Sequence, residues 1–575
     1  MKKLITSLSI TLFGSILCIG QINIQEYKRN HTLTYVKAIE AYQKLDDQFD
    51  DAKLIEMGNA DCGKPLHIFI IDPTRQFNGT NYQNRTVLLI NNGIHPGEPC
   101  GVDASINFAN DLLKDTNFSQ RTSNTVIGII PLYNVGGALN RGCCSRANQN
   151  GPENYGFRGN ARNLDLNRDF IKMDSENAMI FAEIFHFLDP DILVDTHTSN
   201  GADYQYTMTL LTTQLDKLNP QLSTPVRSKL LPLLKEEMKQ KGYPICPYVN
   251  TMQATPDSGI YAYMESPRYC TGYASLFNTI GFTTETHMWK PFADRVQSTY
   301  EFLKVIQDYA NKSSTEILRA RKRAFEHDSA KNVFPLDWKL DTTHYEMIQF
   351  MGYETEYYKS NVTGLETFRY NRDKPWTKQI KYYNKYSPVV AVNKPSHYIL
   401  PQAWKEVHER LKKNGVKMTR LKSDSTIMTT AYFIQDHRTA NRPYEGHYLH
   451  QNIKVITKKQ LISFFKGDYI IPTDQRNVRF IIETLEPQGV DSYFAWNFFD
   501  EVLQQKEYFS HYIFEKRAEE ILSSQPALKT EFNQLKSTDP DFEKNHWNQL
   551  YWIYKHSENY EPSHLRYPIF RVEID

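Results

Sequence analysis

The stretch TVLLINNGIHPGEPCG, residues 86–101, decides how this sequence is read. An apolar run typical of a buried strand leads directly into a tight turn that carries His95 and Glu98. A catalytic zinc ion takes imidazole and carboxylate ligands, and Gly97 between the two residues permits the backbone angles of such a turn. With 17 histidines and 66 acidic residues in 575, chance gives roughly two His-x-x-[Asp/Glu] matches, and the chain has them at His95 and His186. The turn therefore needs support from other parts of the chain.

The overall composition is that of a soluble globular protein. At 575 residues the chain exceeds one ordinary domain, so two or more are expected. Apolar residues make up 40% and charged residues 23% of the chain. The formal charge of +1 offers no electrostatic basis for binding nucleic acid or an anionic membrane, so no nucleic-acid partner is expected. The sequence leaves the oligomeric state open.

The N-terminus predicts export. Residues 1–20 hold two lysines, then an apolar segment of about 15 residues and a glycine near the end, which is typical of a signal peptide. A lipid anchor at Cys18 is disfavoured because Leu17 stands where a small residue is needed. No later segment reaches the length of a transmembrane helix. We expect a periplasmic, extracellular or cell-surface protein.

The cysteines give no metal motif. The six that follow the signal segment show no Cys-x-x-Cys spacing, so a zinc site built from cysteines is not expected. In an oxidising compartment some of them should pair, and the sequence does not say which. They are Cys62, Cys100, Cys143, Cys144, Cys246 and Cys270.

Strand-type and helix-type runs alternate up to about residue 325. The predicted strands cover residues 64–72, 85–93, 125–134, 191–201 and the end of 275–287, and the predicted helices cover 31–58, 101–115, 175–188 and 295–313. Such alternation predicts an α/β domain with a mixed, mostly parallel sheet sandwiched by helices. We assign residues 21–325 to this domain.

The composition changes after that point. Residues 326–575 contain Tyr- and Thr-rich strand-like runs, a clear helix at 402–415 and a Trp/Phe-rich helix at 492–505. We interpret this part, here called the accessory region, as α+β and assign it no role. It is expected to pack against the first domain or to narrow its cleft.

Several predicted strands end in reactive side chains. Sites in open α/β sheets form at the carboxyl ends of strands, where DTHTSNG brings His197 and TTETH brings Glu285. His197 is well placed to be the third metal ligand beside His95 and Glu98, and Glu285 suits a general base. His186, within an amphipathic helix, is interpreted as a surface or core-edge residue.

The motifs HPGE, DLNRDF, DTHTSNG and TTETH, in this order, resemble the zinc metallocarboxypeptidase family over roughly residues 25–310. The resemblance implies a zinc carboxypeptidase-like fold and one zinc ion held by His95, Glu98 and His197. It implies that Glu285 is the general base and that Asn167 and Arg168 grip the terminal carboxylate of the substrate. A guanidinium fork beside an amide suits a carboxylate geometrically.

Two supporting roles follow from the same resemblance. Asp165 would accept the second ring N–H of His95 and fix its tautomer. Arg158 would hold the oxyanion, with Arg162 and Arg146 as rivals for that role. The tyrosine that caps the substrate in this family is not placed by the sequence; the candidates are Tyr261, Tyr263, Tyr269 and Tyr273.

The implied activity is hydrolysis of C-terminal peptide bonds by zinc-activated water, with a peptide or protein C-terminus as substrate. The same chemistry would also serve a peptidase of peptidoglycan stems or a deacylase. From a different class, the chain could be a non-catalytic exported protein that binds glycans or peptides.

Overall fold

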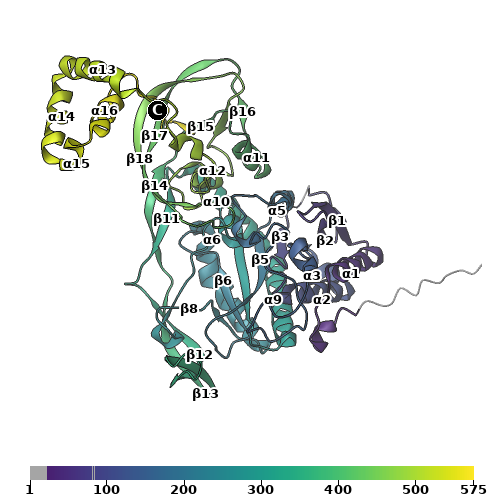
Figure 1. Ribbon diagram of the computed structural model, residues 1–575. Helices are drawn as coiled ribbons and strands as arrows, with labels where there is room; N and C mark the ends of the chain where they lie inside the picture. The colour runs from purple at the N-terminus through teal and green to yellow at the C-terminus, as the bar shows by residue number, and fades with distance from the viewer. Residues whose placement is uncertain (1–22, 80–81, 83, 575) are drawn as a thin grey trace, which may run out of the picture.

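The computed structural model describes residues 23–79, 82 and 84–574 (Figure 1). The predicted signal peptide, residues 1–20, lies outside the described residues. Within the described part, no helix combines the length and the apolar character that crossing a membrane requires.

An eight-stranded sheet forms the centre of the first domain. Its strand order is β1-β2-β4-β3-β5-β10-β6-β7, and the four middle strands run parallel to one another. The pairs β1–β2, β2–β4 and β10–β6 are antiparallel, so the sheet is mixed, as predicted. The strands are β1 (Ala52–Asn59), β2 (Pro65–Ile71), β3 (Thr86–Asn91), β4 (Thr125–Ile130), β5 (Ile192–Ser199), β6 (Met208–Thr212), β7 (Ile245–Pro247) and β10 (Ile280–His287).

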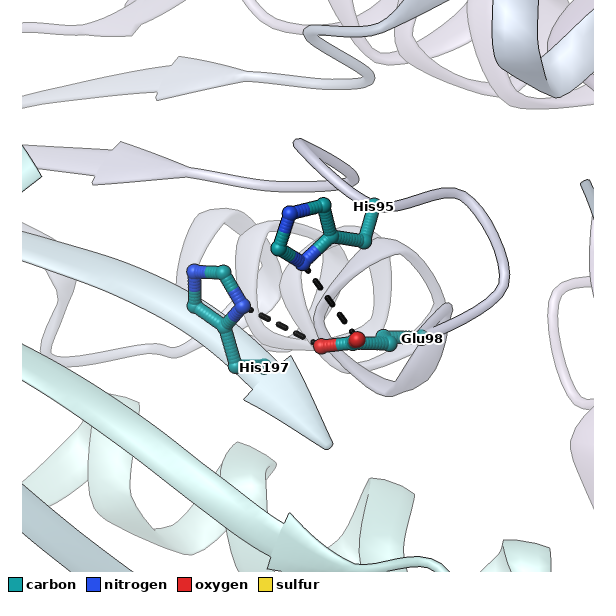
Figure 2. A group of neighbouring side chains, drawn as sticks. All are labelled: His95, Glu98 and His197. Atoms are coloured by element: carbon teal, nitrogen blue, oxygen red, sulfur yellow. Dashed lines mark hydrogen bonds and ion pairs between the residues drawn. The ribbon is translucent and has the colours of Figure 1, made fainter. Parts of the chain in front are cut away.

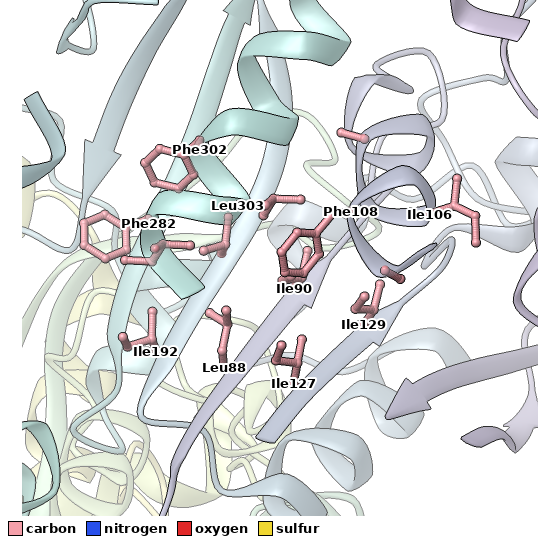
Figure 3. Packing of buried hydrophobic residues seen from close by; sticks show 14 of the residues in the cluster. Leu88, Ile90, Ile106, Phe108, Ile127, Ile129, Ile192, Phe282, Phe302 and Leu303 are labelled. Carbon is pink, nitrogen blue, oxygen red and sulfur yellow. The ribbon is translucent and has the colours of Figure 1, made fainter. Parts of the chain in front are cut away.

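Helices cover both faces of this sheet, which explains why its inner strands are buried along their length. Every residue of β3, β4 and β5 is buried. Successive side chains point to opposite faces, so Leu88 and Ile90 join one core cluster while Val87 and Leu89 join the other. The first cluster packs under α1 (Tyr35–Gln48), α2 (Cys100–Lys114) and α9 (Phe292–Lys312), and the second under α5 (Glu176–Leu188) and α8 (Cys270–Ser275). Figure 3 shows Phe108 and Phe302 from the first set of helices above these strands.

The predicted helix over residues 31–58 is too long. Helix α1 ends at Gln48, and residues 52–59 form the edge strand β1 instead. Along β1, Ala52 and Leu54 are buried while Lys53 is exposed, which is the two-residue period of a half-buried strand. This alternation was hidden by the helical spacing that precedes it.

The accessory region begins as a continuation of the first domain. Helix α10 (Ser314–Ala330) leads into β11 (Val333–Leu340), which pairs with β14 (Tyr386–Asn393). A long hairpin, β12 (Glu346–Lys359) and β13 (Glu366–Tyr383), extends from this pair. A six-stranded sheet follows; it contains β15 (His397–Leu400), β16 (Thr419–Arg420), β17 (Ser425–Thr439), β18 (His450–Phe464), β19 (Tyr469–Pro472) and β20 (Phe570–Val572).

Helices complete the accessory region. The predicted helix at 402–415 is present as α11 (Lys405–Lys413), and α12 (Val478–Leu485) lies over the second core cluster. Four helices that the sequence analysis did not predict precede the last strand, β20: α13 (His511–Ser524), α14 (Pro526–Thr538), α15 (Pro540–Glu543) and α16 (His546–Lys555). Figure 1 shows them as a separate group beside β17 and β18, away from the central sheet.

The predicted Trp/Phe-rich helix at 492–505 is wrong. This segment forms turns and ends in a short 3-10 helix, Asp500–Leu503. Asn497 has a φ of 66°, a left-handed conformation that interrupts a helix. The aromatic side chains of Tyr493, Phe494 and Trp496 are all fully buried, so tertiary packing determines the backbone here.

A polar network beneath the turn at residues 92–98 fixes its direction. Asn92 Oδ1 accepts hydrogen bonds from Ser105 Oγ and Thr196 Oγ1, both at 3.0 Å, and Asn92 Nδ2 donates to the Ile130 carbonyl at 3.1 Å. Gly101 lies against this network, and a Cβ added there would overlap Thr196 Oγ1 and Asn92 Oδ1.

We therefore expect Gly101→Ala to lower the free energy of unfolding by about 1–3 kcal/mol, because the network must shift to make room. Gly142→Ala is the matched control, since a Cβ at Gly142 meets no atom within 4 Å. Thermal unfolding of both variants measures the effect. Equal midpoints for the two variants would contradict the account.

Candidate active site

Three side chains from two strand ends converge on a point that could hold one metal ion. His95 and Glu98 come from the turn after β3, and His197 comes from β5. One possible ligand atom from each residue lies within 4.8 Å of the others. Figure 2 shows both rings facing the same carboxylate: His95 Nδ1 is 3.3 Å from Glu98 Oε1, and His197 Nδ1 is 3.1 Å from Glu98 Oε2. The predicted ligand set is therefore brought together.

The far nitrogen of each ring is held by a second carboxylate. His95 Nε2 donates to Asp165 Oδ1 at 2.8 Å, as the sequence predicted, and His197 Nε2 donates to Asp195 Oδ2 at 2.9 Å. These bonds leave each Nδ1 lone pair free on the side of Glu98. Two neutral imidazoles and one carboxylate, each oriented in this way, fit zinc and leave a position for water.

Asp195 was missed by the sequence analysis, although the sequence carried a signal for it. Residues two apart on a strand share a face, so Asp195 and His197 in DTH lie side by side. Asn91 Nδ2 donates to Asp195 Oδ1 at 3.0 Å and fixes the carboxylate from the neighbouring strand.

The charge around His197 favours a cation, while Glu98 already has the cationic Arg146 beside it. Burial alone would raise the pKa of Glu98, but Arg146, His95 and His197 hold it well below its ordinary value. Burial lowers the pKa of His197, yet Asp195 and Glu98 raise it well above its ordinary value. Surroundings that favour a proton on a buried imidazole also favour a divalent cation in its place.

Glu285 lies beside His197 because the strand register pairs them. In the parallel pair β5–β10, Glu285 is the partner of His197. Burial raises the pKa of Glu285 to about 8, with a further contribution from the negative charges of Glu98 and Glu265 and an opposing one from His197 and Arg146. A divalent cation at the nearby ligands would act in the same direction as His197 and favour the carboxylate form.

Asn167 and Arg168, the residues expected to bind a terminal carboxylate, lie at the end of η2 (Leu166–Arg168). Arg168 Cζ lies 4.4 Å from the centre of the Tyr269 ring. Its Nη1 donates to the Asn167 carbonyl at 2.7 Å, and Asn167 Oδ1 accepts from Cys270 N at 3.3 Å. Both side chains line the same cleft as the metal ligands.

The three candidate arginines for oxyanion binding lie in different places. Arg158 Nη1 is 3.4 Å from His95 Nδ1 and 3.5 Å from Glu98 Oε1, while its Nε and Nη2 donate to Asp165 at 3.0 and 2.8 Å. Arg146 donates to Glu98 Oε1 at 2.7 Å and to the Thr198 carbonyl at 2.8 Å. Arg162 instead donates to the Asp174 carbonyl and does not line the cleft.

All these groups share one cleft with a volume of about 560 Å³. Asp165 stands behind His95, and the other seven predicted residues line the cleft: His95, Glu98, Arg158, Asn167, Arg168, His197 and Glu285. An adjoining pocket of about 360 Å³ shares three lining residues with it, namely Leu211, Tyr248 and Tyr263.

The tyrosine candidates separate clearly. Tyr263 and Tyr269 line the cleft, with the Tyr263 hydroxyl donating to that of Tyr269 at 2.7 Å. Tyr273 is 1% exposed and donates to Asn414 Oδ1, so it is a packing residue. Tyr261 belongs to β9 (Ile260–Tyr261) and does not line the cleft. Tyr248 lines the cleft and was not considered from the sequence.

The structure also shows the cysteine pairing, a further carboxylate in the cleft and the position of His186. Cys143 and Cys144, neighbours in the loop that carries Arg146, form a disulfide, while Cys62, Cys100, Cys246 and Cys270 are free. Glu265, which the sequence analysis missed, lines the cleft and is only 6% exposed. His186 packs against Phe277 with ring centres 4.8 Å apart, as a core-edge residue would.

Comparisons with known proteins indicate carboxypeptidases. Residues 39–188 match the family model described as zinc carboxypeptidase. Carboxypeptidase 2 of Trichophyton rubrum is 21% identical over 425 residues, which covers 70% of this chain and 72% of that protein. Carboxypeptidase 2 of Trichophyton equinum is 22% identical with the same coverage.

Solved structures of carboxypeptidases are also among the matches. A metallo-carboxypeptidase from Burkholderia cenocepacia has 13% identity and a TM-score of 0.36, over 48% of this chain and 69% of that chain. A carboxypeptidase A from Helicoverpa armigera has 14% identity and a TM-score of 0.36, over 50% of this chain and 74% of that chain.

The match assigns residues 39–188 to the zinc carboxypeptidase family, and the curated relatives and the metal-ligand cluster support a zinc-dependent hydrolase. The matched residues include the turn with His95 and Glu98 and the Asn167–Arg168 pair. His197 and Glu285 lie beyond the match and join the site through β5 and β10. Zinc is the metal of this family, and the three clustered residues are able to hold it.

The hydrogen bond between His197 and Asp195 gives a test of the metal site. We expect Asp195→Asn to weaken zinc binding by roughly 10–100-fold, because the amide no longer fixes the ring orientation and basicity. The zinc dissociation constant is measured by competition with a chelator. Asp191→Asn, one residue before β5 and away from the ligands, is the control and should leave the constant unchanged. Equal constants for wild type and Asp195→Asn would contradict the assignment.

Proposed function

We propose that the protein is an exported zinc-dependent carboxypeptidase that removes residues from the C-terminal ends of peptides. One observation supports this above the others. The cleft that contains the metal-ligand cluster and Glu285 also contains Asn167 and Arg168, which together suit a free carboxylate. A hydrolase that ignored the chain end would have no need for this pair at that position.

The chain supplies the groups that such a reaction needs. When bound, zinc supplies a Lewis acid that polarises the scissile carbonyl and the attacking water. Glu285 accepts a proton from that water and returns it to the leaving amine. Arg158, whose Nη1 already faces the metal-ligand cluster, donates a hydrogen bond to the oxygen on which negative charge develops. Asn167 and Arg168 hold the terminal carboxylate and so place the last peptide bond between these groups.

Export rests on residues 1–20, whose composition is that of a signal peptide. It places the activity in the periplasm, outside the cell or at its surface. Fractionation of cells that express the full chain and the chain without residues 1–20 tests it, because only the full chain should leave the cytosol.

The same site chemistry would suit a peptidase of peptidoglycan stems or a deacylase, and these differ in what they require of the substrate. We expect a peptide with a free C-terminal carboxylate to be cleaved with a kcat/KM at least about 100-fold above that of its amidated twin, because Arg168 and Asn167 then bind an ion rather than a neutral amide. Steady-state kinetics on the pair measures this. Equal rates on both peptides would favour one of the alternatives.

The proposed role of Glu285 in proton transfer can be tested with a single substitution. We expect Glu285→Gln to lower kcat by roughly 10²–10⁴-fold while the protein still binds one zinc ion, because the amide has the same shape but cannot accept the proton. Native mass spectrometry reports the zinc and single-turnover kinetics the rate. A native rate in this variant would show that another group is the base. Absence of zinc from the wild-type protein would favour a non-catalytic binding protein instead.

Glu265 is the basis for a proposal about which C-terminal residue the enzyme prefers to remove. It is a buried carboxylate whose Oε2 accepts from Thr271 Oγ1, and in the described part of the chain it takes part in no ion pair. The nearby Lys217 is directed at Glu483, with Nζ 3.7 Å from its Oε2. A cationic side chain on the departing residue would neutralise Glu265, so we propose a preference for C-terminal Lys or Arg.

Replacing this carboxylate should change selectivity rather than chemistry. We expect Glu265→Gln to lower kcat/KM for Lys- and Arg-ended peptides by roughly thirtyfold or more, because a buried charge pair is lost, with little change for Leu-ended peptides. Glu346→Gln, at the adjoining pocket, is the control. A parallel loss on both kinds of peptide would show that Glu265 has only a structural role.

A further inference from the structure

A tight turn of the accessory region, residues 444–447, lies against the catalytic site and is here called the Tyr444 turn. Tyr444 N donates to the His447 carbonyl at 2.7 Å, and His447 N donates to the Tyr444 carbonyl at 3.1 Å. The two central residues, Glu445 and Gly446, have φ values of 51° and 84°. Positive φ at both central positions is typical of the rigid two-residue turns that close hairpins.

The Tyr444 turn makes three polar contacts with the first domain. Arg168 Nε donates to the Tyr444 hydroxyl at 3.0 Å. Asp165 N donates to Glu445 Oε2 at 2.8 Å, and His447 Nε2 donates to Asp174 Oδ2 at 2.8 Å. Arg168 is proposed to bind the carboxylate of the substrate, and Asp165 orients His95. The Tyr444 turn therefore contacts two residues of the candidate active site.

The contact with Tyr444 completes the fixation of the Arg168 guanidinium. Tyr269 covers one face of its plane, the Asn167 carbonyl accepts from Nη1, and Tyr444 accepts from Nε. Among the described residues no group accepts from Nη2, which remains available to a ligand in the cleft. A free arginine side chain carries about 2 kcal/mol of rotamer entropy, so holding it before substrate arrives favours binding.

The Tyr444 ring is itself held by packing that does not involve its hydroxyl. It stacks on Trp496 with ring centres 6.1 Å apart and planes 19° apart, and Arg268 Cζ lies 5.6 Å from its centre. Removing only the hydroxyl would keep the stack on Trp496 and the ring contact with Arg268, although the hydroxyl also interacts with the Arg268 guanidinium. The hydrogen bond to Arg168 can therefore be tested apart from the fold.

We propose that Tyr444 is a positioning residue of the substrate-carboxylate site, supplied by the accessory region, which holds Arg168 in the geometry that binds a free C-terminus. This inference rests on the proposed carboxypeptidase function. It gives the accessory region a direct part in recognising the substrate, although every metal ligand comes from the first domain.

The test compares Tyr444→Phe with Tyr448→Phe in the full zinc-loaded protein. Tyr448 lies four residues on and is 50% exposed, so its variant controls for the loss of a hydroxyl nearby. We expect Tyr444→Phe to raise KM for free C-terminal peptides about tenfold, as loss of a hydrogen bond to a charged group would, with kcat within about twofold of wild type. Cleavage of the amidated twin and the unfolding temperature should stay unchanged.

Each result decides the matter. An unchanged KM, or an equal loss on free and amidated peptides, overturns the role of Tyr444 while the wild-type preference for the free carboxylate upholds the proposed function. A wild-type protein without that preference overturns the proposed function and this inference with it. A rise in KM confined to the free peptide, absent from Tyr448→Phe, supports the inference.

Discussion

Two imidazole rings that face one buried carboxylate are the constraint on which the site depends. His95 and His197 both direct Nδ1 at Glu98, and each ring is held from behind by an aspartate, Asp165 or Asp195. Such a cluster is costly to bury unless cations lie beside it; Arg146 and Arg158 pair with two of its carboxylates, and a divalent ion among the three ligands would add to them. The arrangement makes physical sense as a site preorganised for a divalent ion.

The parallel centre of the sheet is what makes this convergence possible. Strands β3, β5 and β10 have their carboxyl ends on the same side of the sheet, so His95 and Glu285, 190 positions apart in the chain, meet there. The register of β5 and β10 sets Glu285 beside His197, and the polar network on Asn92 directs the preceding turn toward them. Packing on both faces of the sheet therefore fixes the distances on which the proposed proton transfer and carboxylate binding depend.

Much of the first domain could be predicted because its signals are local. The apolar run before His95 and the DTH strand end follow strand periodicity, and each carries its ligand at a known end of the sheet. The contact between Asp195 and His197 could also have been predicted, because residues two apart on a strand share a face. Tyr444 was not, because nothing in its own neighbourhood indicates a contact 276 residues away with Arg168. The helix predicted around Trp496 was wrong for a similar reason, because burial of its aromatic side chains overrides the helical pattern of the sequence.

The most direct test of the account is a crystal structure of the zinc-loaded protein with anomalous scattering measured at the zinc edge. The account predicts one strong anomalous peak per chain, with Nδ1 of His95, Nδ1 of His197 and a carboxylate oxygen of Glu98 as its protein ligands. A peak elsewhere in the chain, or bonds through Nε2 with the two aspartates displaced, would contradict it.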